Sequence, residues 1–346
     1  MARAVLVLVG AVVPLGVTGV ASGAPCPEPS WNLSVTGTDA QFRGLDAVDG
    51  RVAWVSGTKG TVLRTTDRGR SWQQVGPPDT ATLEFRDIEA FDADHAVTLS
   101  IGPGDTSRVY RTDDGGKHWQ LAFRNADPNA FYDCLAFFDH RRGLAMSDPV
   151  DGKFRLMATE DGGRSWQLVP SEGMPPALPG EAGFAASGQC ITTAGPRDAW
   201  IATGGGAKAR VLHSGDGGRH WQAAETPLPS SQSAGVFSVA FRDPWHGAAI
   251  GGDYAVPDAP GVALALSADR GRSWRTPAQA PVGCRSGLAW RGDSLIAVGP
   301  GGSDLSADGG RHWTKFDAGS FDSVSCSAHG DCWASGVKGR VARLVR

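Results

Sequence analysis

Six aspartates recur in one pattern along the chain, Ser/Thr-x-Asp-x-Gly-x-x-Trp, and they are the first residues to test for chemistry. A carboxylate held in a turn can act as a general acid or base. It can equally accept N–H bonds from its own turn, while Gly permits left-handed backbone and Trp packs between sheets. Six equivalent turns cannot all surround one substrate. We therefore expect a structural role for Asp67, Asp114, Asp161, Asp216, Asp269 and Asp308.

The spacing of this motif defines a repeat. Successive Asp residues are 47, 47, 55, 53 and 39 positions apart, about the length of one four-stranded propeller blade. Apolar segments such as Leu45–Val48 and Ala53–Gly57 precede the motif, and Trp72–Val75 follows it. Alternating apolar residues with Gly and Asp between them are typical of antiparallel strands joined by short turns.

The last copy of the repeat has no motif of its own. Val324–Ser327, Cys332–Gly336 and Arg340–Arg346 supply three strands, and Ser30–Val35 matches the pattern of the fourth strand Ser71–Val75. Closing the ring in this way hides exposed strand edges. We predict an all-β, seven-bladed β-propeller of four-stranded blades. It occupies residues 30–346 as a single domain, and the N-terminal strand completes the last blade.

Arginines recur at two positions of the repeat. Loops from second to third strands and between blades fall on one face of a propeller, and nearly all the longer segments of this chain lie there. Guanidinium groups suit carboxylates, phosphates and planar amides. We predict a binding patch on this loop-rich face. Near the ends of first strands the patch contains Arg43, Arg86, Tyr132 and Arg285, and Gln189 occupies the same position in its blade. In third strands it contains Arg108, Arg155 and Arg210, and Arg340 occupies the same position in the last blade.

Two alternatives to this binding patch stay open. The arginines can instead pair with local carboxylates such as Asp87, Asp133 or Glu89 and decorate a rim. The same face also carries the residues of a carbohydrate-active, sialidase-like glycoside hydrolase, in which paired carboxylates would act; the candidates are Asp133, Asp148, Glu181, Asp253 and Tyr254. The Arg-Ile-Pro segment and the Tyr/Glu nucleophile pair of sialidases are missing from the sequence, which favours binding.

Cofactor, metal and nucleic-acid functions have little support. No GxGxxG segment follows a strand and opens a helix, so we expect no cofactor. His118, His220 and His312 each precede a motif Trp and repeat because the turn repeats, so we expect no metal site. The formal net charge is −3, whereas phosphate neutralisation needs a strongly basic face.

The first residues predict the compartment. Met1–Arg3 carries one positive charge, Ala4–Val20 is almost wholly apolar, and small residues follow to Ala24. This pattern is typical of a secretory signal peptide over residues 1–24. We expect an exported protein, secreted or periplasmic, with no stable membrane span after cleavage. In an oxidising compartment cysteines can pair, and Cys326 with Cys332 is the first choice for a local disulfide.

The six motifs resemble the Asp boxes of the bacterial neuraminidase repeat propellers. The unit FRGLDAVDGRVAWVSGTKGTVLRTTDRGRSW also resembles the photosystem II assembly/stability factor-like propellers, from about Trp31 to Arg346. Some members of that broad family carry oxidoreductase or glycosyl hydrolase labels. The resemblance implies an exported protein that binds or helps to assemble another protein, without a cofactor. Members that assist photosystem II are described as binding through an arginine patch on one propeller face.

Overall fold

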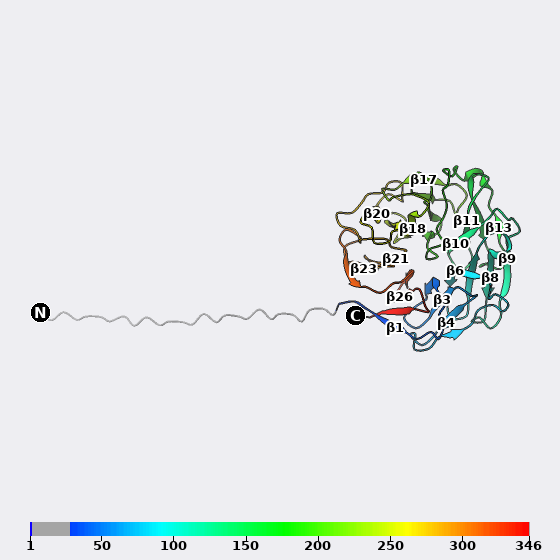
Figure 1. Ribbon diagram of the computed structural model, residues 1–346, viewed down its shortest axis with the longest axis horizontal. Coiled ribbons are helices and arrows are strands. Elements are labelled where there is room, and N and C mark those ends of the chain that lie inside the picture. The colour runs from blue at the N-terminus through cyan, green and yellow to red at the C-terminus, as the bar shows by residue number, and fades with distance from the viewer. Residues whose placement is uncertain (2–27, 346) are drawn as a thin grey trace.

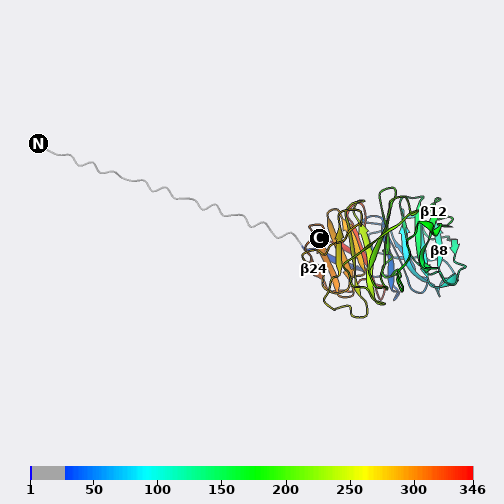
Figure 2. The ribbon, with the colours of Figure 1, turned by 90° about the horizontal axis from the view of Figure 1, so that it is seen from above.

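The computed structural model describes Met1 and residues 28–345. Apart from Met1, the predicted signal peptide lies outside these residues. The described strands form seven antiparallel sheets that radiate around a central axis (Figure 1). Seen edge-on, the sheets stand side by side as the blades of one ring (Figure 2). This arrangement confirms the predicted seven-bladed β-propeller.

Blades 1 to 3 each have four strands, numbered from the axis outward. Blade 1 contains β2 (Phe42–Ala47), β3 (Ala53–Gly57), β4 (Val62–Thr65) and β5 (Gln73–Gln74). Blade 2 contains β6 (Glu84–Ala90), β7 (Ala96–Ile101), β8 (Arg108–Thr112) and β9 (Gln120–Arg124). Blade 3 contains β10 (Tyr132–Phe137), β11 (Gly143–Val150), β12 (Lys153–Thr159) and β13 (Gln167–Leu168).

Blades 4 to 6 continue the ring. Blade 4 contains β14 (Ile191–Ala194), β15 (Asp198–Ala202), β16 (Arg210–Ser214) and β17 (Gln222–Glu225). Blade 5 contains β18 (Ala234–Phe241), β19 (Gly247–Asp253) and β20 (Leu264–Ser267). Blade 6 contains β21 (Gly287–Arg291), β22 (Ser294–Gly299), β23 (Gly302–Ser306) and β24 (Thr314–Asp317).

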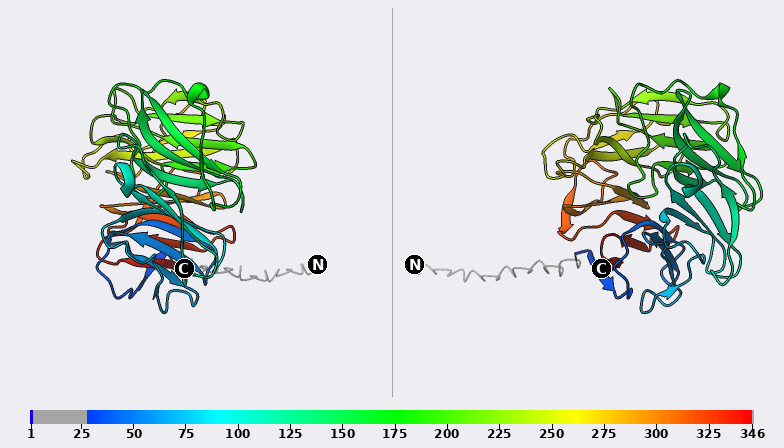
Figure 3. Two further views of the ribbon diagram at one scale, coloured as in Figure 1. Left: turned by 90° about the vertical axis from the view of Figure 1, so that its right-hand side faces the viewer. Right: turned by 45° about the vertical axis from the view of Figure 1, so that its right-hand side comes forward.

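Blade 7 joins the two ends of the chain. It contains β25 (Ser323–Cys326), β26 (Cys332–Ser335) and β27 (Val341–Val345), with β1 (Ser30–Ser34) as its outer strand. β1 pairs antiparallel with β27 from Ser30 opposite Val345 to Ser34 opposite Val341, and the two lie together in both views of Figure 3. The predicted closure by the N-terminal strand is therefore confirmed.

Helical structure is minor among the described residues. It consists of two single turns of 3-10 helix, η1 (Gly104–Thr106) and η2 (Ser171–Gly173). In this part of the chain, no helix is long and apolar enough to cross a membrane.

The fourth strand of blade 5 is reduced to one bridge, between Leu266 and Arg275. In blades 1 and 3, the residue three positions after the motif Trp donates its N–H to the third strand, as Val75 does to the Val62 carbonyl at 2.9 Å. Blade 5 has Pro277 at that position. Proline has no N–H to donate, so the strand ends there.

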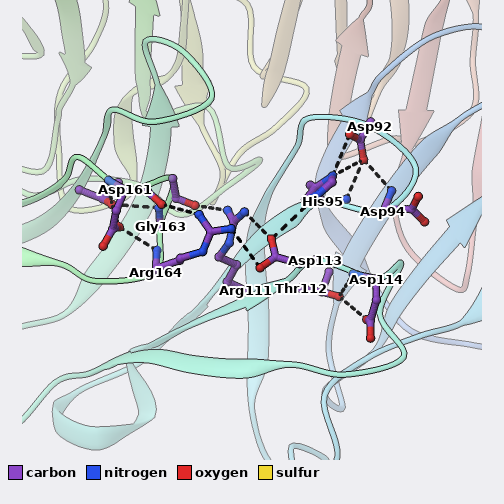
Figure 4. A network of polar contacts seen from close by, with 12 residues as sticks. Asp92, Asp94, His95, Arg111, Thr112, Asp113, Asp114, Asp161, Gly163 and Arg164 are labelled. Atoms are coloured by element: carbon purple, nitrogen blue, oxygen red, sulfur yellow. Dashed lines mark hydrogen bonds and ion pairs between the residues drawn. The ribbon is translucent and has the colours of Figure 1, made fainter.

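Each motif folds as a hydrogen-bonded turn, here called a box turn. Asp161 accepts the N–H of Ser165 at 2.9 Å and the Thr159 hydroxyl at 2.8 Å. Gly163 donates its N–H to the same hydroxyl, and its φ of 85° is one that glycine adopts without strain. Arg111 of blade 2 reaches this turn, and both Arg111 and Arg164 contact Asp113 (Figure 4). The box turns thus also connect neighbouring blades.

The core lies between adjacent blades. Trp54, Trp200 and Trp333 are fully buried on second strands. Two of them pack edge-on against the motif Trp of a neighbouring blade, Trp54 on Trp119 and Trp333 on Trp72, with ring centroids 6.5 and 5.8 Å apart. Burying such large rings at every interface explains why the sequence repeats Trp once per blade.

Two disulfides are present in the described residues. Cys326 and Cys332 are bonded, as the sequence suggested, and they join β25 to β26. The second disulfide, Cys134–Cys190, connects blades 3 and 4 and was not anticipated, because its partners are 56 residues apart. Cys284 is a buried free thiol.

Candidate functional site

The first strands of four blades carry a β-bulge at one shared position. The pairing register shifts between Phe42 and Gly44 in blade 1, and at the equivalent places in blades 2, 3 and 5. A bulge inserts one extra residue and re-aims its side chain. The extra residues are Arg43, Arg86, Asp133 and Phe237.

Two of the predicted patch residues, Tyr132 and Arg285, lie one position before the residue of their blade that is equivalent to Arg43. Tyr132 is only 1% exposed and packs on Phe123, while Asp133 takes the place equivalent to Arg43. Arg285 is 2% exposed and pairs with Asp304 at 2.7 Å, while the next residue, Ser286, faces the axis. A shift of one residue moves a strand side chain to the opposite face. The predicted equivalence of Tyr132 and Arg285 with Arg43 and Arg86 was therefore wrong.

Three of the bulged residues, Arg43, Arg86 and Phe237, line a cavity of about 470 Å³ at the axis, on the loop-rich face. We call it the axial cavity. Larger depressions lie between blades 5 and 6 and beside β1, with volumes of about 650 and 890 Å³. The axial cavity differs from them because it combines guanidinium groups with a cluster of aromatic rings. Its principal lining residues are Arg43, Arg86, Asp322, Phe184, Phe237 and Tyr254.

Arg43 is the least satisfied charged group of this cavity. It makes no hydrogen bond within the described residues, its Nε is buried without a partner, and the nearest carboxylate oxygen, on Asp322, lies 3.9 Å from that Nε. Asp322 instead accepts a hydrogen bond from Gln41 at 2.7 Å. Burial, and then the positive charge of Arg86, lower the pKa of Arg43. The negative charge of an incoming anion would offset both effects, because it stabilises the charged guanidinium.

Arg86 is better satisfied but still faces the cavity. It donates to Glu84 Oε1 from Nη2 at 2.6 Å and to the Ala185 carbonyl at 2.7 Å. Its side chain remains 16% exposed, against 26% for Arg43. The two guanidinium groups thus form a positively charged side of the cavity.

Aromatic rings form the other side. The rings of Phe184 and Phe237 pack edge-on with centroids 4.8 Å apart, and Tyr254 lies 6.3 Å from Phe184. Tyr254 is 59% exposed, which is high for so large a side chain on a folded protein. Exposed aromatic groups beside convergent polar groups are typical of ligand sites.

The floor of the cavity is the segment 183–189, here called the plug, which leads into β14. Gly183 donates its N–H to Asp148 at 2.7 Å, and the Ser187 carbonyl accepts from Ser323 at 2.7 Å. The Gln189 side chain donates across the axis to the carbonyls of Leu288 in blade 6 and Val324 in blade 7, at 3.1 and 2.8 Å. The plug therefore ties blade 4 to blades 3, 6 and 7 across the axis.

The third-strand arginines of the predicted patch all have carboxylate partners nearby. Arg108 pairs with Asp105 at 3.3 Å, Arg155 with Asp127 at 2.6 Å, and the Arg210 Nε with the buried Glu181 at 2.8 Å. These contacts are the local pairing that the sequence left open, although the partners differ from those expected. Arg43 and Arg86 are the patch candidates that line the axial cavity.

The carboxylates considered for hydrolysis do not line the axial cavity. Asp133 is buried, with Oδ2 unpartnered; burial and the charge of Asp148 raise its pKa well above the usual value. Burial raises the pKa of Asp148 to about 6. Asp253 accepts the Ala255 N–H of its own turn. Of the five hydrolase candidates, only Tyr254 lines the axial cavity.

Sequence reasoning missed three of the principal lining residues, Phe184, Phe237 and Asp322. Phe237 and Asp322 precede Val239 and Val324 by two positions, as Arg43 precedes Leu45. Aligning the first strands on these apolar residues would have found both. Phe184 belongs to the plug, which has no counterpart in the other blades and so gave no repeating signal.

The fold and this site define the chain as a seven-bladed β-propeller with a cationic and aromatic cavity on its axis. Comparison with solved structures finds the same architecture in YCF48 bound to D1 peptide, with a TM-score of 0.63 and 16% identity over 91% of this chain and 97% of that one. YCF48 from Cyanidioschyzon merolae gives 0.62 and 16% over 90% and 98%. The WD40 β-propeller domain of Doa1 gives 0.60 and 13% over 92% and 98%.

No protein-family model matches the chain, and no curated protein matches it. At these low identities, the structural likeness establishes the fold. What the axial cavity binds has to be argued from its own residues.

Proposed function

We propose that this propeller is an exported binding scaffold that recognises a segment of a partner protein in its axial cavity. The observation that carries the proposal is Arg43, a cavity-lining guanidinium without a hydrogen bond within the described residues. Phe184, Phe237 and Tyr254 face it. This pairing suits a peptide that presents a carboxylate beside an apolar or aromatic side chain.

The comparisons support a peptide as the ligand class. One structural neighbour with the same propeller architecture is described as bound to a peptide. A peptide also suits the size of the axial cavity, about 470 Å³, which holds one or two side chains rather than a folded surface.

Two features support an extracytoplasmic location. The N-terminal residues have the pattern of a secretory signal peptide. The described residues contain two disulfides, which persist in oxidising compartments and are rare in the cytosol.

The geometry favours binding over glycoside hydrolysis. Asp322 is the one carboxylate among the described residues that line the axial cavity. Hydrolysis by the paired-carboxylate route needs two carboxyl groups on opposite sides of the scissile bond.

Site-directed photo-crosslinking in cells tests the proposal. A photoreactive phenylalanine analogue replaces Tyr254 in the cavity or, as a control, Leu168, which is similarly exposed at 60% on the outer strand of blade 3. The Tyr254 position should capture one defined peptide segment, identified by mass spectrometry, and Arg43→Glu should abolish that capture. The same products from both positions, or capture that survives Arg43→Glu, would overturn the proposal.

A further inference from the structure

A second axial cavity lies on the other side of the plug, towards the box turns. Its volume is about 250 Å³, and we call it the acidic channel. The carboxyl groups of Asp46, Asp87 and Glu89 line it, together with the hydroxyls of Ser187 and Ser325. No Lys, Arg or His is among the described residues that line it. The three acids thus line one cavity that has no cationic side chain among the described residues of its lining.

The hydrogen bonds leave much of the acceptor capacity of these carboxyl groups unused. Asp46 accepts the N–H of Ala90 at 2.7 Å and the Ser325 hydroxyl at 3.4 Å. Asp87 accepts the N–H of Leu135 at 2.7 Å. Glu89 has no hydrogen-bond partner within the described residues, whereas an ionised carboxylate has about four acceptor sites.

The Ser187 hydroxyl gives an independent indication of a missing ligand. The residue is 1% exposed, its oxygen has no hydrogen-bond partner, and it lines the acidic channel. A buried hydroxyl left unpaired costs free energy. The channel therefore lacks a group that supplies positive charge to the carboxylates and a polar contact to this hydroxyl.

We propose that the acidic channel binds a primary ammonium group, carried by a free amine or by a lysine of a partner. An ammonium has three N–H donors on one compact centre, so it can donate to more than one of the carboxyl groups that line the channel. Within the described residues, no three His, Cys, Asp or Glu side chains are arranged to hold a metal ion directly. The plug closes the channel towards the axial cavity, so the ligand enters from the face of the box turns.

The electrostatics of the channel make this binding pH-dependent. Burial, and then the charges of Asp46 and Asp87, raise the pKa of Glu89 well above its usual value. Burial raises the pKa of Asp46 to about 6 and that of Asp87 well above its usual value. An ammonium favours the ionised carboxylates, so its binding releases protons and strengthens as the pH rises from 5 to 8.

Titration calorimetry with n-butylammonium chloride on the purified mature protein tests the proposal. The protein should bind one n-butylammonium per chain and release protons, seen as a heat that depends on the buffer's ionisation enthalpy. Glu89→Gln should weaken binding about tenfold or more, because it removes one charge-assisted contact from a side chain with no protein hydrogen bond. Ser187→Ala should weaken it less. Glu160→Gln, which makes the same change on the exposed box-turn face, should leave it unchanged.

Three further ligands separate the outcomes. Tetramethylammonium chloride has the charge without N–H donors and should not bind. Binding of n-butylammonium alone would assign a free amine, and binding of N-acetyl-lysine methylamide as well would assign a partner lysine. Absence of binding by both amines, equal binding of tetramethylammonium, tighter binding of Ca²⁺ or Mg²⁺, or an unchanged affinity in Glu89→Gln would overturn the proposal.

Discussion

Arg43 and Arg210 show what decides the role of an arginine at the residue scale. Both belong to the predicted patch. Arg210 is committed to Glu181, which is 4% exposed and also accepts from the Thr203 hydroxyl at 2.6 Å. Arg43 has the carboxylate of Asp322 within ion-pair range but no hydrogen bond within the described residues. The Arg210 guanidinium therefore stabilises the fold, whereas the Arg43 guanidinium is available to bind a ligand.

Replacing each of these two arginines by Ala should separate binding from stability. Arg43→Ala should weaken partner capture about tenfold or more while leaving the melting temperature nearly unchanged, because it removes a charge-assisted contact made only with the ligand. Arg210→Ala should lower the free energy of unfolding by about 3–5 kcal/mol, since it leaves the buried Glu181 unpaired. Urea unfolding and capture are measured on both variants. A destabilised Arg43→Ala that still binds would contradict the assignment.

A box-turn carboxylate can be tested in the same manner. Asp161→Ala removes the acceptor of the Ser165 N–H and of the Thr159 hydroxyl. The free energy of unfolding should fall by about 1–3 kcal/mol, and binding should fall only as far as folding does. Glu160→Gln, on the neighbouring exposed side chain, serves as the control and should change stability by less than about 0.5 kcal/mol. An Asp161→Ala protein of full stability that no longer binds would give this aspartate a direct role.

At the scale of elements, the bulges and the plug together form the axial cavity. The bulges turn Arg43, Arg86 and Phe237 towards the axis, and the plug supplies Phe184 and the floor. Gln189 fixes the plug: its side chain donates to two carbonyls and accepts from the Leu288 N–H at 3.0 Å and the Ser238 hydroxyl at 3.2 Å. One side chain of blade 4 thus connects blades 5, 6 and 7.

Gln189→Leu should therefore destabilise the ring as a whole. It keeps a similar volume but leaves buried backbone groups of β21 and β25 without partners, which should cost about 2–4 kcal/mol in the free energy of unfolding. Gln167→Leu changes an exposed glutamine of β13 in the same way and should be nearly neutral. Equal urea midpoints for the two variants would show that the plug is held by other contacts.

At the scale of the whole molecule, two groups of carboxyls respond to pH in opposite directions. Hydrogen bonds from the Ser71 side chain and backbone lower the pKa of Asp67 to about 2, and similar bonds from His118 do the same for Asp114. Burial raises the pKa of Asp46 and of Asp148 to about 6. The usual Asp value is 3.8. The box turns thus stabilise the fold above that value and lose this contribution as the pH falls towards 2.

The buried carboxyls Asp46 and Asp148 act in the opposite sense. Because their folded-state pKa values are raised, their contribution is present below the unfolded value and is lost as the pH rises through about 6. We expect the melting temperature to be highest near pH 4, where both groups contribute, and to fall as the pH rises to about 6. Asp148→Asn should flatten that fall, while Asp151→Asn, on an exposed turn, should not. A melting temperature that rises steadily from pH 5 to 7.5 in the parent protein would contradict this account.

The sequence by itself determined the architecture. Six box motifs at blade spacing, and a terminal segment that matches a fourth strand, were enough for seven blades and their closure, because a propeller repeats one local solution at each interface. The local disulfide Cys326–Cys332 followed from its short separation.

Tertiary structure decided the site. The bulge in blade 3 gave Asp133, rather than Tyr132, the place equivalent to Arg43, and Ser286, rather than Arg285, lines the axial cavity. Local carboxylates bound the third-strand arginines. A bulge changes the face of a side chain without changing the repeat, and the plug crosses the axis only once, so neither leaves a periodic signal in the sequence.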